Sequence, residues 1–185
     1  MDRILIRGAL GQLGIEFIDH FKKLNSFVLA TDIKNPKEKL SCEFELANVL
    51  DKDKMDSLVK KYNINVIYHL VAILSANGEK DPFISWKLNM NSFQNIAQIS
   101  IENKIKKIFW PSSIAVFGTE SKLNFVSQNP LMNPTTIYGI TKLAGEKLME
   151  YYFNKFGLDI RSLRYPGIIS TKTVPGGGTT DYVIE

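Results

Sequence analysis

Tyr138 and Lys142 form a pair of side chains that could carry out acid–base chemistry together. They stand in the pattern YxxxK, with three residues between them. In a helix this spacing puts both side chains on one face, one turn apart. A phenol titrates near a pH of ~10, and a neighbouring ammonium group lowers its pKa toward the range in which a base works at neutral pH. The same pattern also occurs where a lysine faces solvent and a tyrosine caps a core, so the context must decide.

Two hydroxyl groups precede this tyrosine in the sequence. Ser112 and Ser113 follow the run 107–110, which we expect to be a strand. Hydroxyls at the carboxyl end of such a strand could hydrogen-bond a substrate oxygen beside Tyr138. Serines in this position also serve in ordinary turns. Together with the tyrosine and the lysine, they favour a reaction site.

A glycine-rich turn comes directly after the first apolar run. Residues 8–14 read GALGQLG, a GxxGxxG pattern that opens a predicted helix. Glycines there permit close backbone approach to a pyrophosphate, which free N–H groups at the helix start can bind. Asp32 follows at the end of the second predicted strand, where a carboxylate can accept both hydroxyls of an adenosine ribose. No arginine stands beside it, although Lys34 is near, so NAD is favoured over NADP. A glycine turn that packs without a ligand is the alternative.

These groups must be positioned by alternating strands and helices. Short β-branched runs alternate with helical patterns, which is typical of βαβ units around a parallel sheet. Ligands of such sheets lie beyond the carboxyl ends of the strands. We therefore predict an α/β fold with a doubly wound parallel sheet of the Rossmann type, in one domain over residues 1–185. The predicted strands are 3–7, 27–31, 42–46, 66–71, 107–110 and 159–165, and the predicted later helices are 51–62, 82–103 and 135–156.

The first helix is expected to pack on the sheet through one apolar stripe. Its members, at helical intervals of four, four and three residues, are Leu13, Phe17, Phe21 and Leu24. Three long stretches lack such a pattern, and loops of this length in a compact domain are usually functional or mobile. They cover residues 75–81, 118–134 and 166–178.

The composition excludes several classes of function. Of the 185 residues, 44% are hydrophobic and 23% charged, a balance typical of a globular protein with a real core. No apolar run approaches the ~20 residues of a membrane-spanning helix. The net charge of +4 comes from basic residues scattered among acidic ones, which argues against nucleic acid as a partner.

Metal and disulfide chemistry are also disfavoured. Two histidines, one cysteine and no carboxylate cluster do not make a metal site. His69 ends a predicted buried strand, so we expect a satisfied core histidine rather than a ligand. The single Cys42 cannot form an internal disulfide, which leaves the cytoplasm as the default location.

The combined motifs resemble the extended branch of the short-chain dehydrogenase/reductase superfamily, in order and in spacing. They are the glycine turn at 8–14, Asp32, HLVA at 69–72, NMN at 89–91, Ser112–Ser113 and Tyr138 with Lys142. Within this branch the chain is similar to the NAD-dependent L-threonine 3-dehydrogenases. The segments that carry this narrower resemblance are 110–118, 164–170 and above all PGGGTTDY at 175–182.

The resemblance implies oxidation of the L-threonine β-hydroxyl to 2-amino-3-ketobutyrate, with hydride transfer to NAD. It implies Tyr138 as the base, Lys142 as the group that holds the nicotinamide ribose and lowers the tyrosine pKa, and Ser113 as the group that aligns the substrate. Ser75 and Thr179 are implied as further substrate contacts. The expected cofactor contacts are Gly8, Leu10, Gly11, Gln12, Leu13, Gly14, Asp32, Ile33, Lys34, Asn48, Val49, Leu70, Ala72, Asn89, Ser112, Tyr138, Lys142, Tyr165 and Ile168.

Two other interpretations stay open at this point. A nucleotide-sugar 4-epimerase or dehydratase would share the tyrosine–lysine pair, and a truncated, non-catalytic module would still bind NAD. Because relatives continue well past residue 185, we expect the chain to lack the C-terminal part of the substrate pocket. The resemblance also implies a homodimer formed through two helices. The apolar residues that could serve there as interface or core are Phe93, Ile96, Met149 and Phe153.

Overall fold

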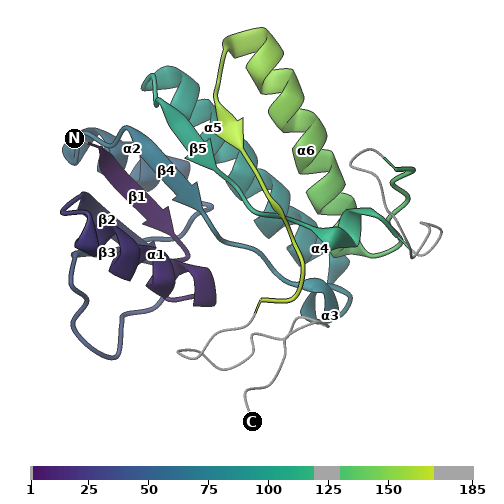
Figure 1. Ribbon diagram of the computed structural model, residues 1–185, viewed down its shortest axis with the longest axis horizontal. Helices are drawn as coiled ribbons and strands as arrows, with labels where there is room; N and C mark the ends of the chain where they lie inside the picture. The colour runs from purple at the N-terminus through teal and green to yellow at the C-terminus, as the bar shows by residue number, and fades with distance from the viewer. Residues whose placement is uncertain (1, 119–129, 169–185) are drawn as a thin grey trace.

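The computed structural model describes residues 2–118 and 130–168 and has a parallel β-sheet at its centre (Figure 1). Six strands form this sheet in the order β3-β2-β1-β4-β5-β7, and every described pairing in it is parallel. The chain winds outward in both directions from β1 and β4, which confirms the predicted doubly wound fold. The strand bounds are β1 Arg3–Arg7, β2 Phe27–Asp32, β3 Glu43–Leu46, β4 Val66–His69, β5 Lys107–Phe109 and β7 Ile160–Arg161.

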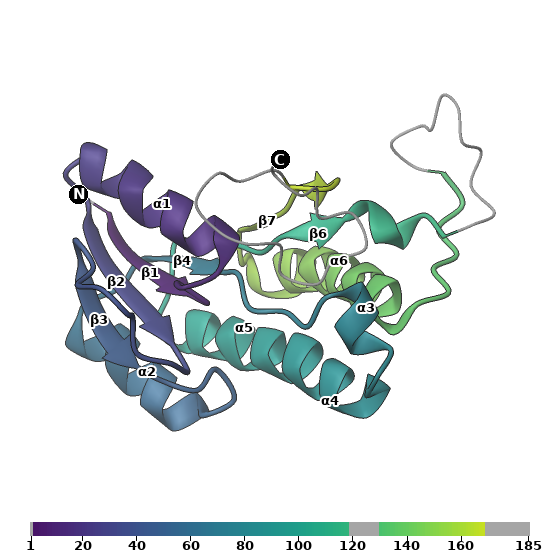
Figure 2. The ribbon, with the colours of Figure 1, turned by 90° about the horizontal axis from the view of Figure 1, so that it is seen from below.

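Helices cover both faces of this sheet (Figure 2). Helix α1 (Gln12–Lys23) packs on one face, while α2 (Lys52–Lys61) and α5 (Ser92–Glu102) pack on the other. Helix α6 (Ile137–Phe156) runs beside α5. The loops at the carboxyl ends of the central strands therefore lie between two helical layers.

Alternate residues of the strands divide the apolar core into two halves. Leu5, Leu29 and Ile67 are fully buried on the face that α2 and α5 cover. Ile6 and Ala30 are fully buried on the face that α1 covers. Successive side chains of a strand point to opposite faces, so runs buried throughout indicate a sheet covered on both sides.

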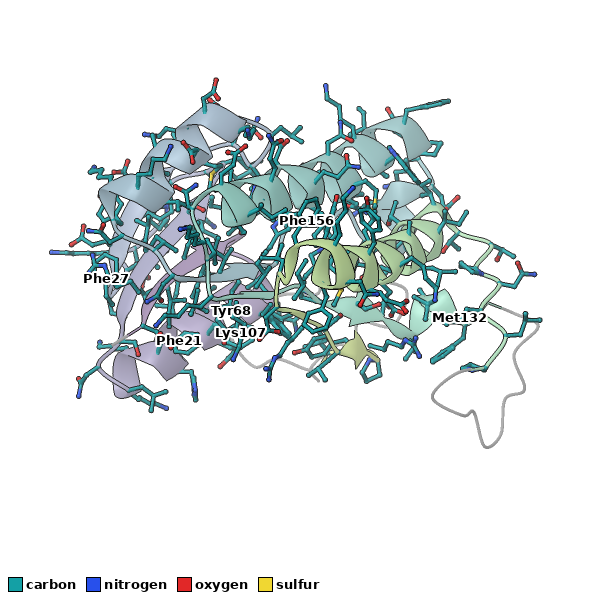
Figure 3. All side chains as sticks on the ribbon, turned by 90° about the horizontal axis from the view of Figure 1, so that it is seen from above. Phe21, Phe27, Tyr68, Lys107, Met132 and Phe156 are labelled. Atoms are coloured by element: carbon teal, nitrogen blue, oxygen red, sulfur yellow. The ribbon has the colours of Figure 1, made fainter. Side chains whose placement is uncertain are left out.

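An aromatic cluster fills the space between α1 and the sheet. Phe17 and Phe21 of α1 contact Tyr68, with 5.1 Å between the ring centroids of Phe21 and Tyr68 (Figure 3). Phe109 joins them from β5. The predicted stripe is therefore confirmed for Phe17 and Phe21. It is wrong for Leu24, which is 57% exposed because α1 ends one residue before it.

The region between β4 and β5 contains more helical pieces than predicted. The predicted helix 82–103 is present as α4 (Pro82–Trp86), a π-helical turn (Lys87–Asn91) and α5, one after another. The predicted loop 75–81 begins with a short helix, α3 (Ser75–Gly78), so its assignment as irregular is wrong there. The wide π turn brings Asn89 against the segment after β4, as its hydrogen bonds show below.

The predicted strand 159–165 is wrong as a single element. It divides into β7 and a separate strand β8 (Arg164–Tyr165), which pairs with β6 (Ser112–Ser113) outside the main sheet. The N–H groups of Trp110 and Ser112 donate to the Arg161 and Leu163 carbonyls at 3.0 and 2.9 Å, so the two segments stay side by side between the main sheet and the β6–β8 pair. The other predicted strands match the observed ones to within two residues at each end.

The apolar residues predicted as interface or core now separate. Phe93 and Ile96 are fully buried in the core of α5, whereas Phe153 on α6 is 59% exposed. Met149 on α6 is partly buried against the same core, so Phe153 is the most exposed of the four, and the homodimer stays a prediction. No helix in the described ranges is long and apolar enough to cross a membrane.

Candidate active site

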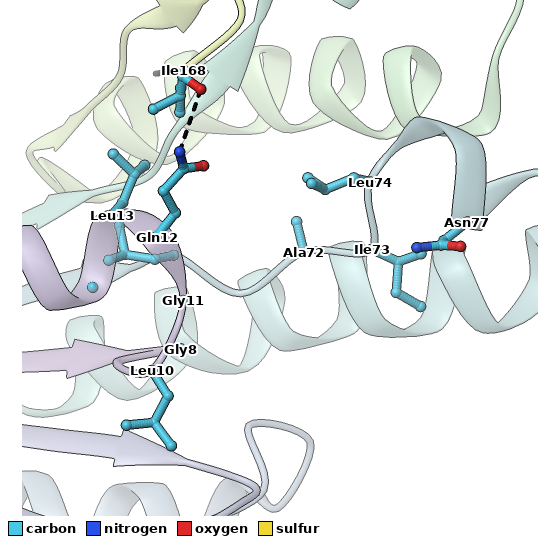
Figure 4. A pocket seen from close by; sticks show the side chains of 12 residues that line it. Gly8, Leu10, Gly11, Gln12, Leu13, Ala72, Ile73, Leu74, Asn77 and Ile168 are labelled. Carbon is cyan, nitrogen blue, oxygen red and sulfur yellow. Dashed lines mark hydrogen bonds between the residues drawn. The ribbon is translucent and has the colours of Figure 1, made fainter. Parts of the chain in front are cut away.

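A cavity of about 540 Å³ lies at the carboxyl ends of β1 and β4, beside the start of α1 (Figure 4). Its lining residues are Gly8, Leu10, Gly11, Gln12, Leu13, Gly14, Leu70, Ala72, Ile73, Leu74, Asn77 and Ile168. All except Ile73, Leu74 and Asn77 are among the cofactor contacts expected from the sequence. These three continue the segment that begins at Leu70, so their place after the fourth strand is the signal that could have found them.

Three glycines shape the turn between β1 and α1. Gly8 has a φ of +78°, a left-handed conformation that favours glycine. A Cβ atom at Gly14 would lie 2.5 Å from the Ala9 carbonyl oxygen, so only glycine lets α1 approach the turn this closely. Gly11 precedes the first residue of α1 and supplies no side chain to cap its N–H groups. The helix therefore presents backbone donors at the cavity.

The Asp32 carboxylate lies against this turn from β2. Its Oδ2 atom accepts from the Leu10 N–H at 3.1 Å, and its Oδ1 atom accepts from the Ile33 N–H at 2.8 Å. A carboxylate held here suits the predicted pairing with ribose hydroxyls. Ile33 and Lys34 themselves are exposed and do not line the cavity.

The turn after β3 carries the residues predicted to meet adenine. The Asn48 side chain is exposed, and its Oδ1 atom accepts from the Leu50 N–H at 2.9 Å. Val49 is buried, and its carbonyl oxygen accepts from Arg7 at 2.9 Å. Neither residue lines the cavity, so an adenine contact at this turn stays a prediction.

Asn89 fixes one wall of the cavity from the π-helical turn. Its Oδ1 atom accepts from the Ile73 N–H at 2.8 Å, and its Nδ2 group donates to the Ile73 carbonyl at 3.1 Å. The same Nδ2 group donates to Thr141 Oγ1 at 3.3 Å. The amide is thus used by protein groups, and Asn89 ties the cavity wall to α6 instead of lining it.

Helix α6 holds Tyr138 and Lys142 in the predicted relation. Thr136 caps the helix by accepting from the Gly139 N–H at 3.1 Å. Lys142 is buried, and its Nζ atom donates to the Pro111 carbonyl at 2.7 Å. The same Nζ atom lies 5.4 Å from the centroid of the Tyr138 ring. The lysine therefore joins the tyrosine to the strand end that carries the serines.

Burial changes the acid–base behaviour of Lys142. It lowers the pKa of this ammonium group from 10.5 to about 7. The Lys142 Nζ atom also lies 4.3 Å from the centroid of the buried Trp110 ring, where a cation interacts with the indole face. The indole is therefore close enough to Lys142 to respond to the charge of the ammonium group.

We expect the fluorescence of Trp110 to change with a midpoint near pH 7, because Lys142 is charged below its pKa and neutral above it. The measurement is a pH titration of tryptophan emission in a Trp86→Phe background, which removes the other tryptophan. The matched Lys142→Met variant should show a flat profile over the same range. A flat profile in the parent protein would contradict the expectation.

The two serines of β6 point to different partners. Ser112 is buried and donates from Oγ to Glu146 at 2.6 Å, so it could meet a cofactor only through its backbone. Ser113 accepts on its Oγ atom from the Ala115 N–H at 3.2 Å and is half-buried. Ser113 is therefore the serine whose hydroxyl stays near the surface of the site.

Glu146 and Arg164 form an ion pair that the sequence did not indicate. The Arg164 Nη2 and Glu146 Oε2 atoms are 2.8 Å apart, and both side chains are less than one fifth exposed. Arg164 lowers the pKa of Glu146 against the opposing effect of burial. Glu146 lies four residues after Lys142, on the same helical face, and that spacing is the signal that could have found it.

The remaining predicted residues fall around this centre. Gln12 donates from Nε2 to the Ile168 carbonyl at 3.3 Å, which closes the cavity on one side (Figure 4). Tyr165 is half-buried and pairs with Ser113 in the register of β6 and β8. Ser75 is the first residue of α3. Thr179 lies outside the described residues.

His69 is buried as predicted but only partly satisfied. Its Nε2 atom lies 3.0 Å from Ser92 Oγ, while its Nδ1 atom has no partner among the described residues. Burial, with smaller effects of Arg7 and Lys142, lowers the pKa of His69 well below its usual value. The histidine is therefore neutral. The described part of the chain contains no group of three side chains that could hold a metal ion.

Known sequences include relatives of this chain. The sequence profile of the NAD dependent epimerase/dehydratase family matches residues 4–183. An uncharacterized epimerase/dehydratase of Staphylococcus saprophyticus is 44% identical over 190 residues, which cover 100% of this chain and 59% of that protein. The chain thus spans 59% of the length of this curated relative.

Solved structures of similar sequence identity share the fold of this chain. An L-threonine dehydrogenase from Clostridium difficile is 43% identical, with a TM-score of 0.92 over 98% of this chain and 58% of that one. A GalE-like L-threonine dehydrogenase from Cupriavidus necator, in its holo form, is 41% identical, with a TM-score of 0.93 over 97% of this chain and 59% of that one. Both similarities extend over nearly all of this chain and less than two thirds of the neighbour.

Proposed function

Because this chain belongs to the NAD dependent epimerase/dehydratase family, we propose that it oxidises L-threonine to 2-amino-3-ketobutyrate with NAD as the hydride acceptor. The observation that carries the proposal is the placement of Lys142 between Tyr138 and the strand end that leads to Ser113. The names of the solved neighbours support the choice of threonine as substrate. The named activity belongs to chains longer than this one, so it is a proposal for this protein.

The residues around the cavity fit a dinucleotide. Gly14 lets α1 pack closely against the glycine turn, and the start of α1 offers backbone donors to phosphate oxygens. Asp32 would accept from the ribose hydroxyls of the adenosine half. Leu70, Ala72 and Ile168 would supply apolar walls. When bound, the nicotinamide ring supplies the hydride acceptor.

The reacting end would use Tyr138, Lys142 and Ser113. Tyr138, as phenolate, would take the proton of the threonine hydroxyl. The proton on Lys142 would compensate the negative charge on the tyrosine oxygen, because a buried ammonium acts strongly on a neighbouring charge. Ser113 would donate a hydrogen bond to the substrate oxygen, and Ser75 and Thr179 would contact the amino-acid part.

The direct test is NADH formation by the purified chain with L-threonine. We expect an increase in NADH absorbance that depends on both L-threonine and NAD. Protection of the protein against thermal unfolding by a UDP-sugar, with no effect of L-threonine, would favour a nucleotide-sugar enzyme instead. Binding of NAD without oxidation of any alcohol tested would favour a non-catalytic NAD-binding module.

A further inference from the structure

Arg7 is a fully buried arginine at the carboxyl end of β1. Its exposed fraction is 0%, and it is among the largest side chains that the core encloses. A charged group taken out of water is costly unless a counter-charge and hydrogen bonds compensate it. The residue directly after it is Gly8, which opens the glycine turn. The core therefore accepts a costly cation at the point where the cavity begins.

The protein compensates this cation only in part. Its Nη2 group donates to the Val49 carbonyl at 2.9 Å, and its Nη1 group reaches the Ser92 carbonyl at 3.5 Å. Its Nε atom has no partner among the residues that the structure describes. No ion pair joins Arg7 to a carboxylate in residues 2–118 and 130–168. Two carbonyl dipoles are thus its described partners.

The neighbours of Arg7 add no negative charge. His69 stands opposite Arg7 in the register of β1 and β4, and Arg7 contributes to keeping it neutral. Burial lowers the pKa of Arg7 to about 9, so the guanidinium is still charged at neutral pH. No acidic side chain in the described ranges forms an ion pair with this guanidinium.

The backbone of Arg7 borders the cavity. The Arg7 carbonyl accepts from the Leu70 N–H at 2.9 Å, and both Gly8 and Leu70 line the cavity. The guanidinium reaches the Val49 carbonyl, in the turn predicted to meet adenine. Arg7 itself does not line the cavity, so a ligand there would interact with its charge through the protein and not through contact.

We propose that the missing counter-charge of Arg7 is the pyrophosphate of a dinucleotide bound at the glycine turn, so that Arg7 strengthens binding of phosphate-bearing ligands without touching them. The inference rests on the proposed binding of NAD and adds a residue to it. A buried charge acts through low-dielectric protein and is screened little by salt, which makes such an effect large for a dianion. Burial of the Arg7 charge is unfavourable in the ligand-free protein, and the negative charge of the bound pyrophosphate offsets this free energy in the complex.

The test removes the charge and keeps a hydrogen-bond donor. In Arg7→Gln we expect the Kd for NAD and for ADP to rise about ten-fold, because one full positive charge near the phosphates is lost. The Kd for adenosine, measured by ligand-observed NMR, should change less than about two-fold, because adenosine carries no charge. The ligand-free variant should unfold at the same temperature as the parent or higher. Arg7→Lys keeps the charge and should bind NAD within about three-fold of the parent.

Arg3→Gln is the matched control. Arg3 lies on the same strand, donates to the Tyr62 carbonyl, and stands about 13 Å away at the other end of β1. Its substitution removes the same charge and should leave the Kd for NAD unchanged. If Arg7→Gln does not fold, Arg7→Lys is compared with Arg3→Gln instead. A ten-fold weaker affinity of Arg7→Lys for NAD would then overturn the proposal.

Other outcomes separate the possibilities. Unchanged NAD and ADP binding in Arg7→Gln would overturn the proposal. An equal loss for adenosine would also overturn it, because Arg7 would then act by holding the turn at Val49. Absence of NAD binding by the parent chain would refute the proposed function itself.

Discussion

Replacing Tyr138 with phenylalanine should lower the rate of NADH formation by about 10²- to 10⁴-fold, the usual contribution of a positioned acid–base group. Only the phenol oxygen is removed. The ring, which lies 5.4 Å from Lys142 Nζ, keeps its place on α6. The glycine turn is built by β1 and α1, so the Kd for NAD should stay within about three-fold of the parent value. Steady-state kinetics and titration calorimetry measure the two quantities.

Tyr151→Phe provides the control for this experiment. Tyr151 lies on the same helix and is 47% exposed, and its phenol oxygen accepts a hydrogen bond from Lys155 at 2.9 Å. Its substitution should leave both rate and binding unchanged. If Tyr138→Phe retained half of the parent rate, Tyr138 would not be the base and the proposed chemistry would be wrong.

Replacing Gly14 with alanine should destabilise the protein by about 1–3 kcal/mol, the usual cost of forcing an extra methyl group into a packed site. The added Cβ atom would lie 2.5 Å from the Ala9 carbonyl oxygen and 2.6 Å from the Gly8 carbonyl oxygen. Both neighbours are backbone atoms, so α1 must move away from the turn. The free energy of unfolding in urea measures the loss, and NAD binding should weaken with it.

Gly11→Ala is the control, because it also replaces a glycine of the turn but adds its methyl group where there is more space. A Cβ atom there would meet only the Gly8 carbonyl oxygen, at 3.3 Å, and the backbone φ of −76° suits alanine. Its unfolding free energy should change by less than about 0.5 kcal/mol. Equal stability of Gly14→Ala and the parent would show that α1 does not need its close approach.

The order of strands and helices could be predicted because hydrophobic periodicity records which faces are covered. The apolar runs at 3–7 and 27–31 indicated a sheet covered on both faces, and four consecutive residues of β1 and of β2 are buried. The division of residues 159–165 could not be read from periodicity. It depends on pairing with the segment around Pro111, about fifty residues earlier, which only tertiary structure brings beside it.

The candidate site was predictable where one turn or strand end supplies it. The glycine turn and the segment at Leu70 and Ala72 are contiguous in sequence and line one cavity. The burial of Arg7 was not predicted, because arginine is rarely fully buried, even beside apolar residues such as those of 4–6. Asn89 was expected at the cofactor, but its reach to Ile73 depends on the π-helical turn.

The Glu146 carboxylate has a consequence for motion at this site. It receives hydrogen bonds from Ser112 on β6 and from Arg164 on β8, and it belongs to the helix of Tyr138 and Lys142. The Glu146 side chain thereby links α6, β6 and β8, which come from separate parts of the sequence. If the crevice opens and closes, we expect Tyr138 and Lys142 to move together with β6 and β8. Their distance from the glycine turn would then be what changes.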